Sequence, residues 1–232
     1  MSVDPPLGEE LDWVAVQPPG RPRLQGSHVL LRPLEVPRDV EGLYGVSHAP
    51  EGDPAIWTYL PYGPFADAGE MRAALESVQT STDAILFTLV LPAEEQPLGV
   101  ASYLRITPEH GVVEIGHIWF ARELQRTTAA TEAVYLLARH VFDDLGYRRL
   151  EWKCDALNAA SRRAAERFGF TFEGVFRKHM VVKGRNRDSA WFALTDERWP
   201  AVRRGFEAWL APENLDGEGR QRRSLGALIE ES

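Results

Sequence analysis

Residues 124–133, with the sequence LQRTTAATEA, join an apolar segment to an amphipathic helix through mostly small side chains. Apolar residues come before the junction and recur at helical spacing after it, so the junction is predicted to be a helix N-terminus. Its backbone N–H groups would lack partners and carry partial positive charge, which suits a phosphate-bearing cofactor. Gln125 and Arg126 would add a side-chain donor and a full charge. The alternative is an ordinary capped helix, because helices often begin with threonine.

The residues that follow predict a further strand and a further helix. Residues 149–154 alternate like a strand, and residues 158–168 form a helical pattern closed by Gly169. A strand that returns through a crossover helix runs parallel to its predecessor, and ligands bind at the carboxyl ends of such strands. Asn158 suits the N-cap of this helix, and Ser161 follows one turn later, so both side chains are expected near the cofactor.

Taken together, these motifs resemble the GNAT superfamily, and more narrowly its ribosomal-protein alanine N-acetyltransferase branch. The motifs are residues 114–119 (EIGHIW), 125–133, 158–161 (NAAS) and 168–174 (FGFTFEG), within a resemblance that covers roughly residues 27–200. The resemblance implies an α+β (mixed α/β) fold. Its central sheet would be mixed but mostly antiparallel, with one parallel crossover pair splayed around the cofactor and with flanking helices.

The resemblance also implies acetyl-CoA as cosubstrate, with its pyrophosphate on the N–H groups of residues 126–131. The usual loop places glycine where this chain has Thr128, whereas Gln125 and Ala130 match it. Threonine disfavours positive φ, so we expect a negative φ at Thr128. The cofactor-binding residues so implied are Ile118, Trp119, Phe120, Gln125, Arg126, Thr127, Thr128, Ala129, Ala130, Thr131, Asn158 and Ser161.

Acetyl transfer to an amine needs an oxyanion stabiliser and, for some acceptors, a base. Backbone N–H groups of residues 115–120 would supply the first, if the parallel strands diverge and leave donors unpaired. Glu114 and His117 are the candidate bases, although an α-amino group with a pKa near 8 needs little help. They lie on opposite faces of an ideal strand, so we expect one of them to face the substrate. Otherwise Glu114 pairs with a cation on a neighbouring strand, and His117 packs in the core.

The departing thiolate also needs a proton or a hydrogen bond. Many superfamily members have a tyrosine at the position of Ala165, so that donor is absent here. In the resembling branch the serine of the Asn-x-x-Ser motif meets the thiolate, and Ser161 matches it; its alternative role is a bond to the backbone of the first helical turn. The branch can also use a glutamate on the strand at residues 175–182, which contains no acid. His179 is the substitute that this strand offers.

An aromatic loop precedes these motifs and is broken by prolines. We expect it to cover the acceptor through Trp57, Tyr59, Tyr62 and Phe65, unless the loop packs on itself. Arg185 and Arg187, near a later hairpin tip, would either contact an acceptor carboxylate or lie in solvent. Cys154 is expected to pack in its strand.

Composition limits the function classes. The net charge of −8 argues against broad affinity for nucleic acid or anionic membranes and is compatible with an amine substrate. No apolar run approaches the roughly 20 residues that cross a bilayer. A single cysteine, scattered histidines and a start without secretory features predict a cytoplasmic protein with no internal disulfide and no metal site.

We predict one domain at residues 27–211, an N-terminal extension at 1–26 and a polar C-terminal tail at 212–232. Leu11, Trp13, Val14 and Val16 would pack the extension on the domain. The remaining predicted strands span residues 28–34, 84–91, 97–106, 171–183 and 187–194, and the remaining helices span 37–47, 66–80 and 199–210.

Three functions fit these residues. The first is an acetyl-CoA-dependent N-acetyltransferase acting on a primary amine, at a protein N-terminus or on a small molecule, as a monomer or homodimer. The second is a detoxification or self-immunity enzyme that acetylates an antibiotic or an aminoacyl-nucleotide. The third is a noncatalytic CoA-binding sensor, because the usual tyrosine and the usual strand glutamate are both missing.

Overall fold

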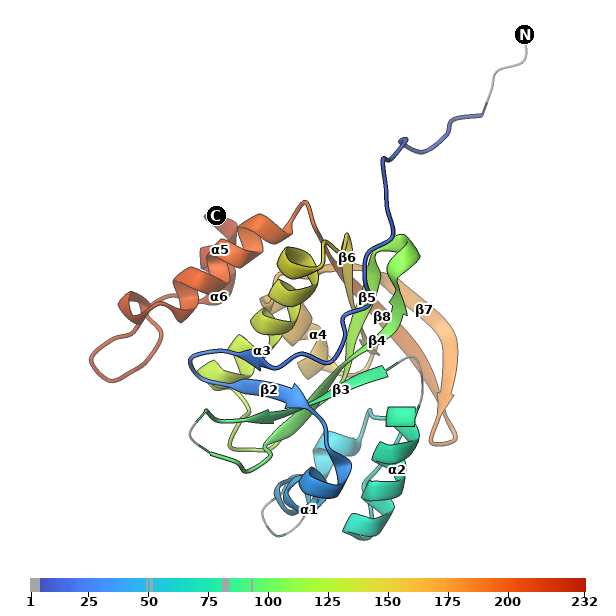
Figure 1. Ribbon diagram of the computed structural model, residues 1–232, viewed down its shortest axis with the longest axis vertical. Helices are drawn as coiled ribbons and strands as arrows, with labels where there is room; N and C mark the ends of the chain where they lie inside the picture. The colour runs from blue at the N-terminus through green and yellow to red at the C-terminus, as the bar shows by residue number, and fades with distance from the viewer. Residues whose placement is uncertain (1–4, 49, 51, 81–83, 93) are drawn as a thin grey trace.

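A single eight-stranded sheet organises the computed structural model, which describes residues 5–48, 50, 52–80, 84–92 and 94–232. Its strand order is β1-β2-β3-β4-β5-β6-β8-β7 (Figure 1). The strands are β1 (Leu24–Gln25), β2 (Leu30–Pro33), β3 (Ala84–Val90), β4 (Gly99–Thr107), β5 (Val112–Phe120), β6 (Arg149–Asp155), β7 (Thr171–Val182) and β8 (Arg185–Thr195).

Two groups of helices flank this sheet. Figure 1 shows α1 and α2 side by side at one end of the molecule, whereas α3, α5 and α6 lie together away from them. The α-helices are α1 (Val36–Ser47), α2 (Ala68–Thr80), α3 (Thr128–Arg139), α4 (Ala159–Arg167), α5 (Trp199–Leu210) and α6 (Leu225–Glu230). A short π-helix (His140–Asp144) continues α3, and short 3-10 helices span Pro54–Trp57, Pro108–His110 and Pro212–Asn214. These elements confirm the predicted α+β fold.

The sheet is antiparallel except at one pair of strands. β5 and β6 are parallel because α3 carries the chain back across the sheet between them. Their pairing runs from Val112 opposite Arg149 to Ile115 opposite Trp152 and then stops. Beyond that point β5 continues to pair with β4, and β6 continues to pair with β8. The predicted splay of the parallel pair is therefore confirmed.

A β-bulge in β5 lies where the two strands part. Three residues of β4, Val100 to Ser102, stand opposite four of β5, Gly116 to Trp119. His117 lies within this interval and has a φ of 49°, a left-handed value that is uncommon outside glycine. An extra residue in one strand bends that strand and increases its twist, which is how the bulge contributes to the divergence.

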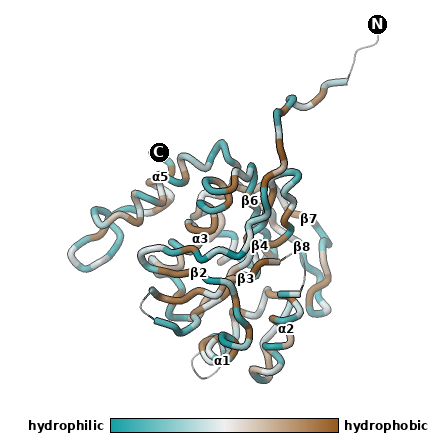
Figure 2. The backbone as a smooth tube through the Cα atoms, viewed as in Figure 1, coloured by the Kyte–Doolittle hydropathy of each residue, from teal (hydrophilic) through white to brown (hydrophobic). Residues whose placement is uncertain are grey.

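The interior is one continuous apolar cluster, and in Figure 2 hydrophobic segments gather on the central strands. One charged pair is buried beside it. The guanidinium of Arg32 donates two hydrogen bonds to Asp39, at 2.7 and 2.6 Å, and Thr88 donates a third to the same carboxylate at 2.7 Å. This pair fastens α1 to β2 and β3, next to the core.

Part of the N-terminal extension packs on the domain. The Trp13 indole donates to the Glu109 carbonyl and lies against Gly111, and Val16 is partly buried against the core. Leu11 and Val14, in contrast, are exposed. The first strand of the sheet, β1, also comes from this extension.

The C-terminal segment contains a packed helix, which the expectation of a polar tail did not include. Leu225, Leu228 and Ile229 of α6 are buried, and Ile229 lies directly over Gly205 of α5. The polar residues between the two helices conceal this pattern in the sequence, since only three apolar positions in α6 face the domain.

Candidate functional site

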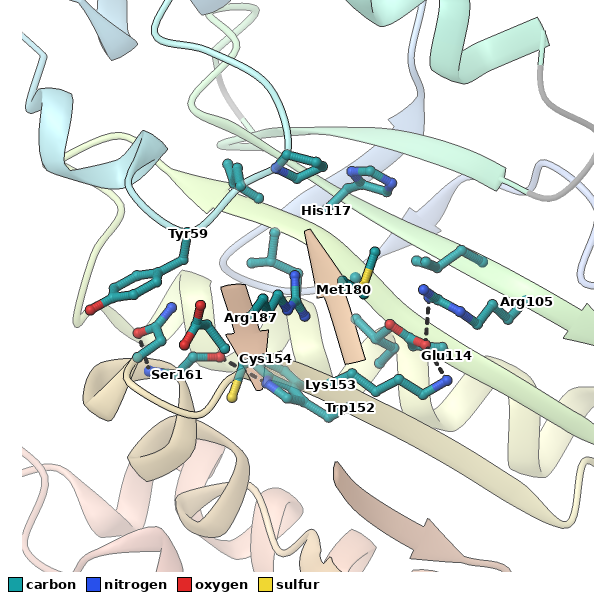
Figure 3. A pocket seen from close by; sticks show the side chains of 18 of the residues that line it. Tyr59, Arg105, Glu114, His117, Trp152, Lys153, Cys154, Ser161, Met180 and Arg187 are labelled. Carbon is teal, nitrogen blue, oxygen red and sulfur yellow. Dashed lines mark hydrogen bonds and ion pairs between the residues drawn. The ribbon is translucent and has the colours of Figure 1, made fainter. Parts of the chain in front are cut away.

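A cavity of about 290 Å³ lies where β5 and β6 diverge (Figure 3). Its walls come from β4, β5, β6, β7, β8, the start of α4 and the loop that follows Pro54–Trp57. The polar and charged residues that line it are Tyr59, Arg105, Glu114, His117, Lys153, Asp155, Asn158, Ser161 and Arg187. Segments far apart in the sequence therefore meet at the place where parallel-sheet folds bind ligands.

Ser161 and Asn158 occupy the N-terminal turn of α4. The Asn158 side chain accepts a hydrogen bond from the Ser161 backbone N–H at 3.0 Å, as an N-cap does. The Trp152 indole donates to the Ser161 hydroxyl oxygen at 2.9 Å. Because a hydroxyl has one proton and two acceptor lone pairs, this contact orients the oxygen and leaves the proton to be donated elsewhere. Ala165 is buried and does not line the cavity.

Glu114 lines the cavity and is held by cations from both neighbouring strands. One of its oxygens accepts from Arg105 of β4 at 2.8 Å and from Lys153 of β6 at 2.9 Å. Burial raises the pKa of the Glu114 carboxyl above its ordinary 4.5, although Lys153 and Arg105 oppose the shift. The alternative prediction, that Glu114 pairs with a cation on a neighbouring strand, therefore describes its contacts. The same carboxylate also borders the cavity, as a base would.

His117 lines the same cavity, contrary to the expectation that strand alternation would turn one of the two residues away. The bulge explains the difference, because the left-handed φ at His117 interrupts the alternation of side chains. Its Nδ1 lies 3.1 Å from the Tyr62 hydroxyl, and the two rings stack. Burial, with a contribution from Arg105, lowers the pKa of His117 to about 4, so its ring is neutral at physiological pH.

His179 lies on β7, outside the wall of the cavity. Its Nδ1 lies 2.9 Å from the hydroxyl of Ser189, and that hydroxyl oxygen accepts a hydrogen bond from Arg187. Burial and the positive charges of Arg187, Lys153 and Arg105 lower the pKa of His179. Ser189 thus links the His179 ring to Arg187 in the cavity wall.

The N-terminus of α3 follows the diverging end of β5. Thr127 caps the helix by accepting from the Ala130 N–H at 3.1 Å. Thr128 opens the helix without a positive φ, as expected, and the left-handed residue of the loop is Arg126, with a φ of 62°. Within the part of the chain that the structure describes, the N–H groups of Arg126, Thr128 and Ala129 make no hydrogen bond. These three donors are the ones that would meet a diphosphate.

The other predicted cofactor residues have structural contacts of their own. Ile118 lines the cavity, whereas Trp119 is buried against Trp57. The Gln125 side chain donates to the Phe120 carbonyl at 2.9 Å, which fixes the loop between β5 and α3. Thr131 is buried and accepts from Arg167 of α4 at 3.1 Å.

The aromatic loop divides into an inner and an outer part. Trp57 is fully buried, with Tyr62 and Phe65 packed around it, and none of the three lines the cavity. Tyr59 does line it, and its hydroxyl donates to the Leu157 carbonyl at 3.2 Å. The Lys183 ammonium at the β7–β8 hairpin tip donates to the Trp57 carbonyl at 2.7 Å. The loop is thus fastened on two sides above the cavity.

Lys153 and Arg105 were not among the predicted site residues. The Lys153 side chain is only 4% exposed, bonds Glu114 and Glu151, and lies 3.6 Å from the centre of the Trp191 ring. The available signal was alternation, because Lys153 shares one face of β6 with the charged residues Arg149 and Glu151, whereas Leu150, Trp152 and Cys154 form the other face. Arg105 is aimed by a second bulge, in β4, where its φ is 47°; the sequence gives no comparable indication of that bulge.

The described residues include neither a metal site nor a membrane-spanning helix. Within them, no group of three or more His, Cys, Asp or Glu side chains has an arrangement that would hold a metal ion. The described helices include none that is both long and apolar enough to span a bilayer.

Comparison with known proteins gives consistent similarities. Residues 28–171 match the family model described as the acetyltransferase (GNAT) domain. The crystal structure of a GCN5-related N-acetyltransferase from Brucella melitensis is 42% identical, with a TM-score of 0.90, and the match covers 94% of this chain and 99% of that one. The uncharacterized N-acetyltransferase p20 of Bacillus licheniformis is 27% identical over 145 residues, which are 61% of this chain and 81% of p20. Bacillus subtilis (strain 168) YdaF, provisionally named a ribosomal N-acetyltransferase, is 29% identical over 101 residues, covering 44% of this chain and 55% of YdaF.

Proposed function

The chain belongs to the GNAT acetyltransferase family, and we propose that it transfers the acetyl group of acetyl-CoA to a primary amine, at a protein N-terminus or on a small molecule. The observation that carries this proposal is the divergence of β5 from β6 beside the N-terminus of α3. The divergence opens a space at the carboxyl ends of two parallel strands, and the helix end offers unpaired N–H donors next to it. The space between the strands suits a thioester, and the N-terminus of α3 suits a diphosphate.

Acetyl-CoA fits the groups present. The N–H groups of Arg126, Thr128 and Ala129 would hold its pyrophosphate, and Asn158, which lines the cavity, would contact the pantetheine arm. Acetyl-CoA would supply the activated acetyl group as a thioester. Backbone donors of β5 beyond Ile115, which have no β6 partner, would stabilise the negative charge that develops on the carbonyl oxygen.

Ser161 would donate its hydroxyl proton in a hydrogen bond to the departing thiolate. The Trp152 indole already occupies one lone pair of the Ser161 oxygen, so the proton is directed away from that contact. Glu114 would accept a proton from the acceptor amine, directly or through water, because its raised pKa strengthens it as a base. His117 is a weaker base with its pKa of about 4, and we assign it to positioning together with Tyr62.

Calorimetry and thiol release test this function separately. We expect acetyl-CoA and free CoA to bind, and free thiol to appear only when an acceptor is added. The acceptor panel comprises short peptides with free N-termini, amino acids, polyamines and aminoacyl compounds. Binding without acceptor-dependent thiol release across the panel would favour a CoA-binding sensor. The absence of binding to either nucleotide would exclude the proposal.

A further inference from the structure

Arg187 presents a guanidinium to the cavity that the catalytic assignments leave unused. It lies on β8, is half-buried, and lines the cavity together with Ser161 and Glu114 (Figure 3). Its Nε donates to the Ser189 hydroxyl at 3.2 Å, and Ser189 is fully buried. This contact fixes one edge of the guanidinium, so the two terminal nitrogens form the edge that is available to a ligand.

Arg187 differs from the other cations of the cavity in its partners. Three cationic side chains line the cavity, Arg105, Lys153 and Arg187, and Glu114 and Asp155 are the carboxylates that line it. Arg105 and Lys153 are both paired with Glu114, and Lys153 also with Glu151, whereas Asp155 accepts from the Leu157 N–H at 2.8 Å. Among the described residues, no carboxylate lies within ion-pair distance of Arg187. A half-buried guanidinium that faces the cavity without a carboxylate partner indicates an anionic ligand group.

We propose that the acceptor carries a carboxylate close to its amine, and that Arg187 binds this carboxylate and so determines acceptor specificity. The proposal rests on the proposed acetyl transfer and adds the chemical class of the acceptor. A guanidinium fixed at one edge suits bidentate binding of a carboxylate, and this pairing is stronger and more directional than a contact with a neutral amide. The acceptor is therefore an α-amino acid, or a peptide with Asp or Glu near its N-terminus.

The titration of nearby groups agrees with a positive field on this side of the cavity. Arg187, Lys153 and Arg105 contribute, after burial, to lowering the pKa of His179. Arg105 contributes in the same way to lowering the pKa of His117. Both imidazoles are consequently weaker proton acceptors, and the positive field that lowers their pKa values would also attract an acceptor carboxylate.

Matched acceptors test the proposal. Each carboxylate acceptor is paired with a neutral counterpart: an amino acid with its amide, and a peptide with Asp at its second position with the same peptide carrying Asn. We expect kcat/KM to be at least about tenfold higher for the carboxylate member of the effective pair, as one charge-assisted hydrogen bond would give. The two pairs distinguish a free amino acid from a peptide N-terminus.

Variants of two arginines of β8 test whether Arg187 causes the preference for a carboxylate acceptor. Arg187→Gln should raise KM for the carboxylate acceptor about tenfold or more, with kcat changed much less and with little change for the neutral acceptor. Arg187→Lys should restore part of the loss, since the charge remains but the planar fork does not. Arg185→Gln is the matched control, because Arg185 is exposed and does not line the cavity, and it should stay within about twofold of the parent.

The outcomes separate this inference from the proposed function. Equal kcat/KM for charged and neutral acceptors, unchanged by Arg187→Gln, would overturn the inference while leaving acetyl transfer intact. A loss of acetyl-CoA affinity in Arg187→Gln, measured by calorimetry, would also overturn it by assigning Arg187 to the cosubstrate. If the parent protein neither binds acetyl-CoA nor releases thiol with any acceptor, the proposed function itself fails.

Discussion

At the scale of single residues, the polar side chains that face the cavity are held in position by hydrogen bonds to neighbouring protein groups. Ser161 is oriented by Trp152, Arg187 by Ser189, and Glu114 by Arg105 and Lys153. In the first two cases a protein group occupies one side of the polar group and leaves the other side to the cavity. This arrangement limits the positions that a substrate group can take.

Ser161→Ala tests the proposed thiolate donor. We expect kcat to fall about ten- to a hundredfold, the cost of one hydrogen bond to a charged group, while the Kd for acetyl-CoA stays nearly constant. Stopped-flow thiol release and calorimetry measure the two quantities. Trp152→Phe is the companion variant: it removes the indole donor but keeps the hydroxyl, so its kcat should fall less. A parent-like kcat in Ser161→Ala would remove Ser161 from the mechanism.

The pH dependence of kcat, measured at saturating acceptor so that the titration of the free amine does not enter, distinguishes the two candidate bases. As pH falls through the pKa of Glu114, which burial holds above 4.5, the carboxylate is protonated and the rate should fall. His117 has a pKa of about 4 and is already neutral at higher pH. We therefore expect Glu114→Gln to lower the rate at least about tenfold and to remove its decline at low pH, the acid limb of the profile. His117→Asn should keep this acid limb. An acid limb that survives in folded Glu114→Gln would exclude Glu114 as the base.

At the scale of elements, two β-bulges determine which side chains reach the cavity. One bulge in β5 includes His117, and the other in β4 includes Arg105, each with a left-handed φ. A regular strand would place Glu114 and His117 on opposite faces. The bulges instead bring both to one cavity and turn Arg105 toward Glu114, so local irregularity contributes as much to the site as strand order does.

The contact between α5 and α6 predicts the effect of a substitution at Gly205, and a glycine in α1 serves as the control. A Cβ on Gly205 would lie 2.5 Å from Ile229 Cγ1 and 2.9 Å from the Ile229 Cα, so α6 would have to move. Gly205→Ala should therefore destabilise the protein by about 1–3 kcal/mol despite the better helix propensity of alanine. Gly45→Ala in α1 faces open space and should stabilise by roughly 0.5–1 kcal/mol. Urea unfolding compares the two; equal effects would contradict the docked position of α6.

At the scale of the whole molecule, stability rests on one continuous core and on a few buried polar contacts that join distant segments. Glu132 of α3 accepts the N–H groups of Ser27, His28 and Val29, and Arg32 pairs with Asp39 across β2 and α1. Each contact holds a helix or strand in one position on the apolar core. Apolar packing alone, which is not directional, would allow several positions. The cavity is therefore held by residues well outside it.

The Arg32–Asp39 pair predicts a pH-dependent part of the stability. Burial alone would raise the pKa of Asp39, but hydrogen bonds from Arg32, from Thr88 and from the backbone of Glu35 outweigh it and lower the value below 3.8. The stabilisation is present in full above the unfolded value and is lost as pH falls through the lower folded value. Asp39→Asn should cost about 3–5 kcal/mol at pH 7, because it leaves Arg32 buried without a charged partner.

Urea unfolding at pH 7 and near pH 3 measures this effect. Asp39→Asn should also flatten the decline of stability in that acid range. The control is Glu95→Gln, which breaks the exposed pair between Glu95 and Arg38 and should change stability by less than about 1 kcal/mol. A loss in Asp39→Asn no larger than in the control would show that the buried pair contributes little.

The sequence by itself determined the order of elements, the parallel pair, the helix caps at Thr127 and Asn158, and the place of Ser161 beside the diverging strands. Caps and periodic patterns act over three or four residues, so a linear chain displays them directly. Tertiary structure alone decided that Glu114 and His117 face one cavity, that Lys153 and Arg105 hold Glu114, that Trp57 lies inward, and that α6 packs on α5. Those features depend on strand register, bulges and contacts between residues tens of positions apart, which no local pattern encodes.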